Sequence, residues 1–563
     1  MTRLLKRLPD PAEPDTTSPV LLRLRPGFPD TAPLDAGPLD AAPLDTVGPL
    51  FEPGNTCWRV ERADRAAVLI DAADYFRAAK AALLGARHQI ILLGWDFDPR
   101  TRLEPQNGLH DDHDRLGQIL QALADARPEL TVHVLKWNMY LPVALRFPMV
   151  PLRLQNLFTN PRMHYHLDDR HPLGATQHQK LLVVDDRVAL CGGIDFAVDR
   201  WDTPAHRPHD ARRRLPGGGT FGPRHDVGIV LEGPIARTLG ELARDRWANA
   251  TGRQLAAPPP PSGSPSTDRT SSDPPSPWPS PSPWPSHVAP DFRRVEVAVA
   301  RTHPAWGNQD EVREVEALYM ASIARAKRWI YLESQYFASR RVADLLANRL
   351  EEPDGPDVVL MCSLHSPSYF DRLGIDPLRS ELLARLRAAD RHGRLRALAP
   401  VASDGGFVVV HSKVTIIDGV FLRLGSSNLA ERSMGFDSEL DVAIQAEHPD
   451  DSTAAAIRDV CCRLWADHMG VTPETVRRAF DAEPRLSRVF DRLRHRRGKG
   501  VIDLDDGPPG FMPRLVRAAG LIDPATARPA RRVTWALKWG TVAAAAGAVW
   551  WAGKRLGTRR SRC

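Results

Sequence analysis

The sequence has few of the features that mark secreted or disulfide-stabilised proteins. Its six cysteines show neither CxxC pairs nor a framework spacing, which indicates free thiols in a reducing compartment. The opening stretch MTRLLKRLPDPAEPD lacks the apolar core of about 7–15 residues that a secretory signal needs, so export by that route is not expected. Charged residues make up 26% and apolar residues 42% of the chain, which excludes a mostly disordered protein.

What is present is a long chain with a mild positive charge. From its 563 residues we expect two or three domains with room for large cores. The formal net charge is +6 and the isoelectric point is near 9.1, which suits a phosphate-bearing partner or an anionic membrane surface. Many soluble proteins share such a bias, so the charge alone does not decide the partner.

Two proline-rich tracts divide the chain. Residues 1–52 carry the repeat PLDAG PLDAA PLDTV, whose five-residue period fits neither helix nor strand, and we expect a disordered arm there. Residues 256–290, with PPPPSGSPS and SPWPSPSPWPS, are predicted to form an extended linker. The linker separates two candidate domains, residues 53–255 and 291–470.

The two candidate domains repeat one pattern of elements. The stretches ARHQIILLGWDF and AKRWIYLESQYF each indicate a helix end, a buried strand, and polar or aromatic residues where the strand ends. Short apolar strands alternate with amphipathic helices in both domains. We therefore predict an α/β fold of two similar domains, each a mixed β-sheet layered with helices, related by a pseudo-twofold axis.

One polar motif occurs twice, more than two hundred residues apart. HQKLLVVDDRVALCGGID begins at His178 and HSKVTIIDGVFLRLGSSN begins at His411. Aligned on the histidines, Lys follows at +2, Asp at +7, small residues at +14 and +15, and a short polar residue at +17. The matched residues are Lys180 and Lys413, Asp185 and Asp418, Gly192–Gly193 and Gly425–Ser426, and Asp195 and Asn428. Two such copies facing each other predict a single site built from both.

The residue types in this motif suit the chemistry of a phosphate diester. Residues two apart on a strand point to the same face, so each His and Lys pair faces the same way. Converging lysines imply a substrate with dense negative charge. One histidine can attack phosphorus and form a phosphohistidine, while the other protonates the leaving alcohol and then activates the acceptor. The lysines can neutralise the charge of the diester and, with Asn428, position it without a metal, so we predict no metal and no cofactor.

The doubled H-x-K-x4-D motif, followed by GG-x-D and GS-x-N, resembles the phospholipase D superfamily over roughly residues 57–470. The segments LLGWDFDPRT, RHPLGATQHQK, GGIDFAVDRWD, YLESQYFAS and GSSNLAERSMGFDSEL support the resemblance. It implies that both motif histidines are catalytic, that the two motif lysines and Asn428 bind phosphate, and that a downstream acidic residue orients a histidine.

Glu439 fits that orienting role, and Asp226 is its counterpart in the first half. Asp195 occupies the position of Asn428 and is assigned to substrate binding. The motif residues Asp185 and Asp418 are assigned to supporting the site. We assign the nucleophile to His178, although the near-symmetric motifs leave the opposite assignment open.

The C-terminal part combines a basic tail, residues 471–532, with a candidate membrane helix, residues 533–553. An apolar stripe at helical spacing lies among arginines of the tail and comprises Leu486, Val489, Phe490 and Leu493. This pattern suits an anionic bilayer surface, or else an ordinary helix docked on the domain. The uncharged run WGTVAAAAGAVWWAG, extended to Val533, reaches about 31 Å as a helix, close to a hydrocarbon core of about 30 Å. We expect a marginal membrane anchor or an interfacial helix.

Together these features favour phospholipase D-type cleavage of the head-group phosphodiester bond of phospholipids at the cytoplasmic side of a membrane. Phospholipid and a membrane surface are the expected partners. Nucleic acid is not expected, because aromatic residues that could stack on bases make up only 7%. A phosphatidyltransferase of the cardiolipin synthase kind and a nuclease of the same superfamily are the alternative enzymes, and an inactive membrane-binding scaffold is the non-enzyme alternative. The duplicated chain can form the site as a monomer, and the sequence leaves the oligomeric state open.

Overall fold

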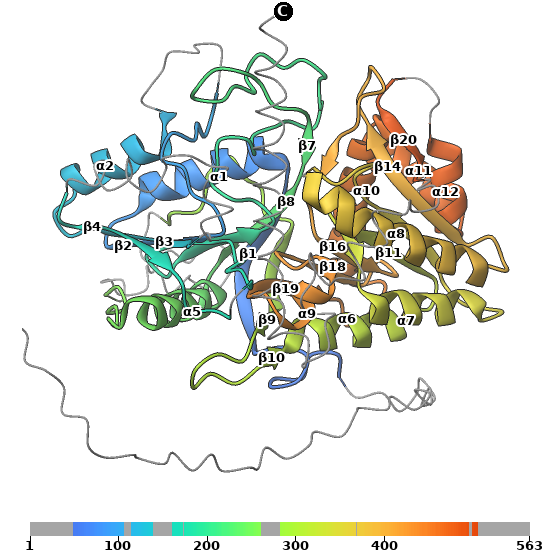
Figure 1. Cartoon of the computed structure of the whole chain (residues 1–563), viewed down its shortest axis with the longest axis horizontal. Coiled ribbons are helices and arrows are strands. Elements are labelled where there is room, and N and C mark those ends of the chain that lie inside the picture. Colours follow the sequence, from blue (N-terminus) through green and yellow to red (C-terminus); the bar gives the residue numbers. More distant parts are fainter. Residues whose placement is uncertain are drawn as a thin grey trace, which may run out of the picture. The chain divides into compact units, whose positions relative to one another are not determined.

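The sheet at the centre of the fold is assembled from both halves of the sequence (Figure 1). The computed structural model describes residues 49–105, 114–138, 160–172, 174–259, 282–367, 369–494 and 498–504, and within them one mixed sheet has sixteen strands. Strand β1 (Arg59–Ile70) pairs antiparallel with β9 (Phe292–His303), and this pair joins the two halves. The α/β class with a mixed sheet layered with helices, predicted from the sequence, is confirmed. The prediction gave each half a sheet of its own, whereas one sheet runs through both halves.

From the β1–β9 pair outward, the two halves present their strands in a matching order. On the first side β1 is followed by β8 (Val227–Glu232), β6 (Val188–Gly192), β5 (Leu181–Val184), β2 (Gln89–Gly94), β3 (Thr131–Trp137) and β4 (Met163–Asp168). On the second side β9 is followed by β19 (Glu439–Gln445), β17 (Phe421–Gly425), β16 (Val414–Ile417), β11 (Trp329–Glu333), β13 (Asp357–Met361), β14 (Leu395–Val401) and β20 (Gly500–Asp503), while β10 (Val312–Arg313) pairs with β9. The pseudo-twofold axis between the halves stays a prediction.

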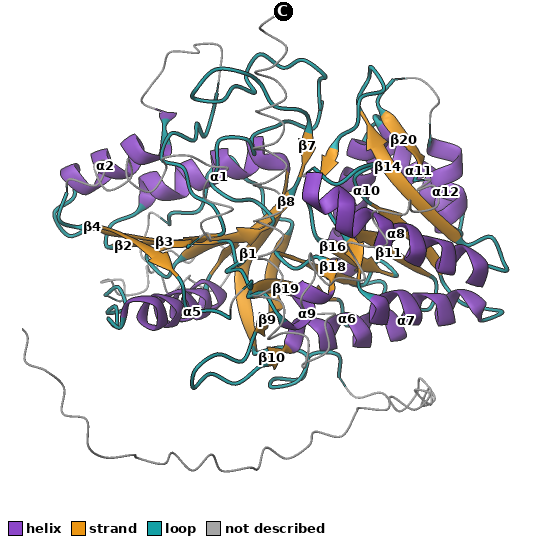
Figure 2. Ribbon diagram, viewed as in Figure 1, coloured by secondary structure: helices purple, strands orange, loops and turns teal. Residues whose placement is uncertain are grey.

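Helices cover both faces of this sheet, as Figure 2 shows. In the first half α1 (Asp71–Gly85) and α2 (Leu116–Ala126) share one apolar core, and α5 (Pro234–Thr251) packs in another. In the second half one core holds α6 (Glu314–Ala324), α7 (Arg340–Glu351) and α8 (Tyr369–Ala389), and the other holds α10 (Ser452–Met469), α11 (Pro473–Ala482) and α12 (Leu486–Leu493). Because both faces are covered, central strands such as β5 and β16 are buried along their whole length.

Two short strand pairs lie outside the main sheet and bring distant segments together. Strand β12 (Phe337–Ala338) pairs with β18 (Leu429–Ala430), next to the short helix α9 (Glu431–Gly435). Strand β7 (Arg224–His225) pairs in parallel with β15 (Val409–Val410), which ends just before His411. The second pairing connects the two halves of the chain at the second motif.

The aspartate at +7 of each motif closes the turn of a hairpin. Asp185 follows β5 and Asp418 follows β16, with φ of 54° and 56° in the left-handed region. The Asp185 carboxylate accepts hydrogen bonds from the backbone N–H groups of residues 87, 88 and 89 at 2.7–2.8 Å. Asp418 does the same for residues 327, 328 and 329. Both aspartates therefore fix the start of a neighbouring strand, at the opposite end of the motif strand from the histidine.

The apolar stripe of the predicted basic tail faces the protein core and not a bilayer. All four of its residues are buried on α12. Phe490 stacks on Tyr331 with ring centroids 5.9 Å apart and also contacts Trp465. Of the two interpretations that the sequence left open, the structure shows the helix docked on the domain, because the arginines that suggested a lipid surface flank a helix packed on the second half. Arg485, for example, pairs with the Asp357 carboxylate at 2.8 Å.

The predicted boundaries shift at the linker and the tail. Trp284, inside the predicted linker, is buried against the first half and lies under the Arg65 guanidinium. Helices α11 and α12 and strand β20 extend the second half beyond residue 470. In the part of the chain that the structure describes, no helix has the length and apolarity needed to cross a bilayer. The candidate membrane helix, residues 533–553, and residues 1–48 lie outside that part.

Candidate active site

Each motif histidine is held by backbone of the opposite half. His178 lies just before β5, and its N–H donates to the carbonyl oxygen of Ser438 at 3.0 Å. His411 lies just before β16, and its N–H donates to the carbonyl oxygen of His225 at 2.8 Å. In each contact the accepting residue, Ser438 or His225, belongs to the half of the chain that does not contain the histidine. The structure thus brings the two motifs to one place, as the sequence predicted.

The side-chain partners of the histidines also cross between the halves. His178 Nδ1 lies 2.9 Å from Oε2 of Glu439, which begins β19. His411 Nδ1 lies 2.7 Å from Oδ2 of Asp226, which follows β7. When its acid is ionised, each carboxylate accepts, so Nδ1 of the ring donates and Nε2 is the nitrogen left for chemistry. The sequence identified both carboxylates, and the structure shows that each orients the histidine of the other motif.

The small residues at +15 of the two motifs support these carboxylates in different ways. A Cβ atom at Gly193 would lie 2.1 Å from Asp226 Oδ1, so only glycine leaves room for that carboxylate. Ser426, at the same position in the second motif, donates its hydroxyl to Glu439 Oε2 at 2.5 Å. Ser433 donates to the other Glu439 oxygen at 2.6 Å. The first motif therefore has glycine at +15, which leaves room for Asp226, and the second has serine, which donates a hydrogen bond to Glu439.

The electrostatics of the site keep both imidazoles neutral. Burial, followed by the charges of Lys180 and Lys413, holds the pKa of His178 well below its usual 6.5. Burial and Lys413 do the same to the pKa of His411. Lys413 belongs to the second motif yet acts on the first histidine, so the two motifs form one electrostatic unit. Neutral rings at pH 7 can act as nucleophile or base before any proton is supplied.

The two lysines lie on the same side as their histidines. Lys180 Nζ donates to the carbonyl oxygen of His178 at 3.0 Å, and Lys413 Nζ donates to that of His411. Burial lowers the pKa of Lys413 to about 7, with Asp226 opposing that shift. A bound anion would favour the protonated lysine, so a phosphate group would restore full positive charge here.

The residues at +17 occupy equivalent positions but have different surroundings. The Asp195 carboxylate lies 3.1 Å from Lys180 Nζ and accepts backbone hydrogen bonds from Trp95 at 3.0 Å and Asp96 at 3.2 Å. Asn428 is buried, and its Oδ1 has no hydrogen-bond partner among the described residues. The Asp195 carboxylate therefore positions a lysine, and substrate binding by Asp195 stays a prediction, as it does for Asn428.

The structure places two arginines near the site to which the sequence assigned no role there. Arg200, in the segment GGIDFAVDRWD, and Arg224, directly before His225, both lower the pKa of His411 by their charge. Arg200 also pairs with Asp199. From the sequence alone Arg200 is expected to be structural, and only its place in a motif segment could have suggested more. Arg224 belongs to no sequence motif. Its position near the site is known only from the structure, in which β7 pairs with β15.

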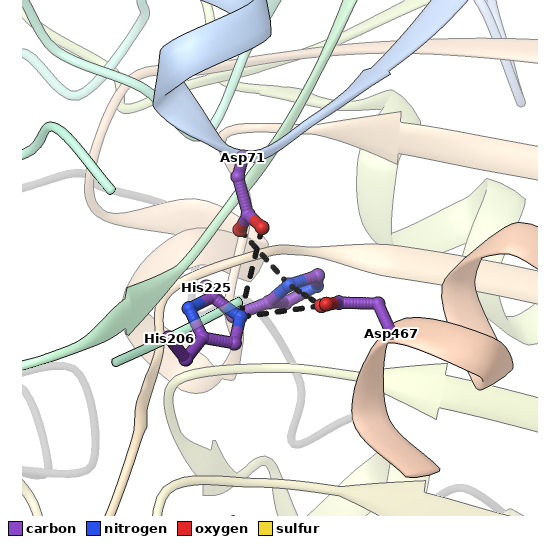
Figure 3. Close-up of side chains that lie close together, drawn as sticks. All are labelled: Asp71, His206, His225 and Asp467. Atoms are coloured by element: carbon purple, nitrogen blue, oxygen red, sulfur yellow. Dashed lines mark hydrogen bonds and ion pairs between the residues drawn. The ribbon is translucent and has the colours of Figure 1, made fainter. Parts of the chain in front are cut away.

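Figure 3 shows a second group of buried titratable residues, and one of them, His225, accepts the backbone hydrogen bond of His411. Asp71, His206, His225 and Asp467 each offer one ligand atom, and these atoms all lie within 4.8 Å of one another. The sequence predicted no metal-ligand set. These four residues come from four separate segments, so no local spacing could have shown the cluster.

Comparison with known proteins assigns the class that this fold and this doubled site suggest. The family model described as phospholipase D matches residues 82–343, and the one described as cardiolipin synthase, PLD-like domain, matches residues 319–465. The chain belongs to the phospholipase D superfamily. The two matches together span both copies of the motif.

The similar proteins share little sequence identity with this chain. Phospholipase D alpha 1 of Carica papaya is 21% identical over 521 residues, which cover 70% of this chain and 63% of that protein. Phospholipase D B of Dictyostelium discoideum is 27% identical over 208 residues, covering 32% of this chain and 17% of that one. A crystal structure of phosphatidylserine synthase from Haemophilus influenzae Rd KW20 has a TM-score of 0.48 and 12% identity, covering 77% of this chain and 95% of its own. The chain thus spans between 17% and 63% of the length of these two phospholipases.

Proposed function

We propose that the protein is a phosphodiesterase of the phospholipase D type, which cleaves the head-group phosphodiester bond of phospholipids through a phosphohistidine. The observation that carries this proposal is the crossed pairing of each motif histidine with a carboxylate of the other half. A folded scaffold without activity would not need two oriented, neutral imidazoles beside two buried lysines. Membership of the superfamily supports the same reaction class.

In the proposed first step Nε2 of His178 attacks the phosphorus of the diester. The bond between phosphorus and the head-group oxygen breaks, and a phosphohistidine forms. The departing oxygen takes a proton from Nε2 of His411 and leaves as an alcohol. His411 is neutral before binding, so we infer that the negative charge of the bound diester raises its pKa and lets it take up that proton.

In the second step the roles of the histidines reverse. His411 removes a proton from water, and the water oxygen attacks phosphorus as the bond to His178 breaks. The products are a phosphatidic acid and the free enzyme with both imidazoles ready for another cycle. Asp226 and Glu439 stabilise the positive charge that appears on each ring in turn. Lys180 and Lys413 neutralise the non-bridging oxygens, and positioning together with this neutralisation accounts for most of the proposed acceleration.

An alcohol in place of water would make the same site a phosphatidyltransferase. The second half of the chain matches the family model described as cardiolipin synthase, PLD-like domain, which keeps this alternative in place. The two reactions share the phosphohistidine and differ only in the acceptor. We propose a membrane surface on the cytoplasmic side as the place of action, since the substrate would be a membrane lipid.

Product analysis separates these functions. The purified full-length protein is incubated with mixed phospholipid vesicles, with and without glycerol, and the products are identified by mass spectrometry. Phosphatidic acid in water supports hydrolysis, and a phosphatidyl alcohol with little phosphatidic acid supports transfer. The absence of both products, with vesicles and with a soluble short-chain diester, would refute the proposal.

The histidine roles are tested on the same substrates. His178→Ala and His411→Ala should each abolish turnover while the fold stays near normal, and His164→Gln, a histidine of β4 outside the site, should keep full activity. A short reaction with a labelled short-chain lipid, quenched at alkaline pH because phosphohistidine is acid-labile, should place the label on His178. Label on His411 would reverse the assignment of the nucleophile. Substantial turnover by either alanine variant would contradict the two-histidine mechanism.

A further inference from the structure

Four buried side chains meet from four separate parts of the fold (Figure 3). Asp71 is the first residue of α1, His206 lies in the loop between β6 and β7, His225 lies in β7, and Asp467 lies near the end of α10. The first three are fully buried and Asp467 is 8% exposed. Three segments of the first half therefore converge on one helix of the second half, and His225 among them adjoins Asp226, the partner of His411.

Four distances between these side chains lie near those around one tetrahedral metal ion. His225 Nδ1 lies 3.1 Å from Asp71 Oδ1 and 3.0 Å from Asp467 Oδ2. His206 Nε2 lies 3.2 Å from Asp467 Oδ2 and 3.6 Å from Asp71 Oδ2. A tetrahedral zinc ion with bonds of about 2.0–2.1 Å holds its ligand atoms about 3.3–3.4 Å apart. The four observed distances, 3.0–3.6 Å, lie on either side of that value, and a small adjustment would bring one oxygen of Asp71 to the ion.

The outer nitrogens of both histidines are already engaged in the way that metal ligands require. His206 Nδ1 lies 2.9 Å from Asp202 Oδ2, and His225 Nε2 lies 3.1 Å from Glu333 Oε2. Metal-bound histidines almost always donate their other N–H to a carboxylate or carbonyl, which fixes the ring and its tautomer. If each ring is neutral and its proton lies on this outer nitrogen, the inner nitrogen (His206 Nε2 or His225 Nδ1) carries a lone pair that is directed at carboxylate oxygens.

Such an arrangement is repulsive unless a positive charge lies between the acceptors. His225 Nδ1 is within 3.1 Å of two carboxylate oxygens yet has no hydrogen bond to either. Asp71 Oδ2 is buried and also has no hydrogen-bond partner among the described residues. Unpartnered polar atoms in a fully buried position are costly, so a cation between them gives them a physical explanation.

The charges of the surrounding residues leave room for a divalent ion. The cluster and its outer partners hold four carboxylates, those of Asp71, Asp202, Glu333 and Asp467. The permanent cations that pair with them in the described part of the chain are Arg213, on Asp202, and Lys499, on Asp467. Two negative charges are left uncompensated, and either one divalent cation or two extra protons on the histidines can balance them.

The competing occupant is therefore a pair of protons. Burial alone would lower the pKa of His206, but the Asp71 and Asp467 carboxylates raise it to about 9 when no metal is bound. A protonated ring would satisfy His206, which has hydrogen-bond geometry to Asp467. Burial would likewise lower the pKa of His225, but the Glu333 and Asp71 carboxylates raise it well above 6.5, so a second proton competes with the metal at this ring too. The oxygens beside His225 Nδ1 nevertheless lie outside hydrogen-bond geometry. The geometry at His225 favours the metal.

We propose that Asp71, His206, His225 and Asp467 form a structural site for one divalent transition-metal ion, with zinc as the first choice. Imidazole nitrogen and carboxylate oxygen are ligands that zinc accepts, and four protein ligands leave no open position for catalysis. The ion would tie α1, the loop before β7, and β7 itself to α10. Since His225 directly precedes Asp226, the ion would hold the carboxylate that orients His411, without touching substrate.

Metal analysis of the purified full-length protein tests the proposal. The protein is stripped with dipicolinate, incubated with Zn²⁺, passed through gel filtration and analysed by inductively coupled plasma mass spectrometry. We expect about one zinc per chain to be retained, together with a rise in Tm relative to the stripped protein. An anomalous scattering peak at the zinc edge would place the ion between the four side chains.

Variants separate this site from incidental binding at the surface. Asp467→Asn and His206→Gln should lose the retained zinc, and Asp202→Asn should weaken zinc affinity by about 10–100-fold. His164→Gln, a histidine outside the cluster, should retain one zinc per chain. Should the ligand variants fail to fold, the wild-type measurement still decides. Wild-type protein that retains no zinc and shows no change in Tm would overturn the proposal, and so would zinc retained equally by a folded Asp467→Asn variant.

Discussion

The Nδ1 atom of His178 lies 2.9 Å from Oε2 of Glu439, a residue 261 positions further along the chain. The reciprocal contact joins His411 Nδ1 to Asp226 Oδ2 at 2.7 Å and crosses in the opposite direction. Each half of the chain supplies one histidine and the acid for the other histidine. Neither half alone therefore contains an oriented imidazole.

Removing the charge of either acid should slow the reaction strongly. Glu439→Gln and Asp226→Asn are each expected to lower kcat by roughly 10²–10⁴-fold, because the neutral amide no longer stabilises the imidazolium and permits the wrong tautomer. The measurement is steady-state kinetics on a soluble short-chain diester. Glu447→Gln, at an exposed glutamate after β19, is the matched control and should be unaffected. Activity near wild type in either variant would show that the crossed pairs do not serve catalysis.

Adding a methyl group at Gly193 should disturb His411 indirectly, through its partner Asp226. The added Cβ would lie 2.1 Å from Asp226 Oδ1, so the carboxylate must move. A displacement of about 1 Å can cost roughly 10²-fold in rate, and we expect Gly193→Ala to lose about that much. Gly217→Ala is the control, since a methyl group there would have no other atom within 4 Å. Equal kinetics for the two variants would contradict the proposed packing.

The pH dependence of the reaction should report the ionisation of Glu439. Burial raises the pKa of this carboxyl to about 8, while the hydrogen bonds from Ser426 and Ser433 lower it. The ionised form stabilises the His178 imidazolium, and the bound diester keeps Lys413 protonated, so kcat at saturating substrate should rise with pH up to about 8. Ser433→Ala removes a donor that favours the ionised form, which raises the pKa and moves the ascending limb to higher pH. A limb that stays in place or moves to lower pH, judged against the exposed-site control Ser452→Ala, would rule out this role of Glu439.

The docking of α12 should be visible in stability. Phe490 is 1% exposed and stacks on Tyr331, so Phe490→Ala is expected to cost about 3–5 kcal/mol of unfolding free energy. Arg488→Ala, on the exposed side of the same helix, should change stability by less than about 0.5 kcal/mol. Chemical denaturation monitored by tryptophan fluorescence measures both. A small effect of Phe490→Ala would revive the membrane-facing interpretation of the stripe.

The segment after Ala530 is expected to deliver the enzyme to a membrane. Each Lys or Arg near an anionic surface contributes about 1 kcal/mol and is weakened by salt, whereas a spanning apolar helix is not released by salt. Deleting everything after Ala530 should leave hydrolysis of a soluble short-chain diester unchanged. The same deletion should move the protein from the membrane fraction to the soluble fraction. An equal loss of activity on soluble and vesicle substrates would show that this segment belongs to the catalytic fold.

The sequence was informative wherever the chemistry is local and repeated. The spacing of His178 and Lys180, repeated at His411 and Lys413, predicted one site from two motifs, because a strand fixes the side-chain direction at that spacing. The same spacing could not show which acid contacts which histidine. That pairing depends on how β7 and β19 approach the opposite motif, which is a property of the whole sheet.

What the sequence left undecided or did not show has a similar cause. The stripe around Phe490 has the period of an amphipathic helix, and both a bilayer and a protein core satisfy that period. Only the position of Tyr331 and Trp465 decides between them. The cluster around His225 draws on residues from 71 to 467, so it has no local signature at all.

The pairing of β1 with β9 has a consequence during protein synthesis. Arg59 lies opposite Val299 in this pair, so β1 has an unpaired edge until a ribosome has made more than two hundred further residues. An exposed strand edge is a template for association with other chains. Nascent first halves on neighbouring ribosomes are therefore at risk of pairing with one another, and chaperone protection would matter most in the interval before β9 emerges.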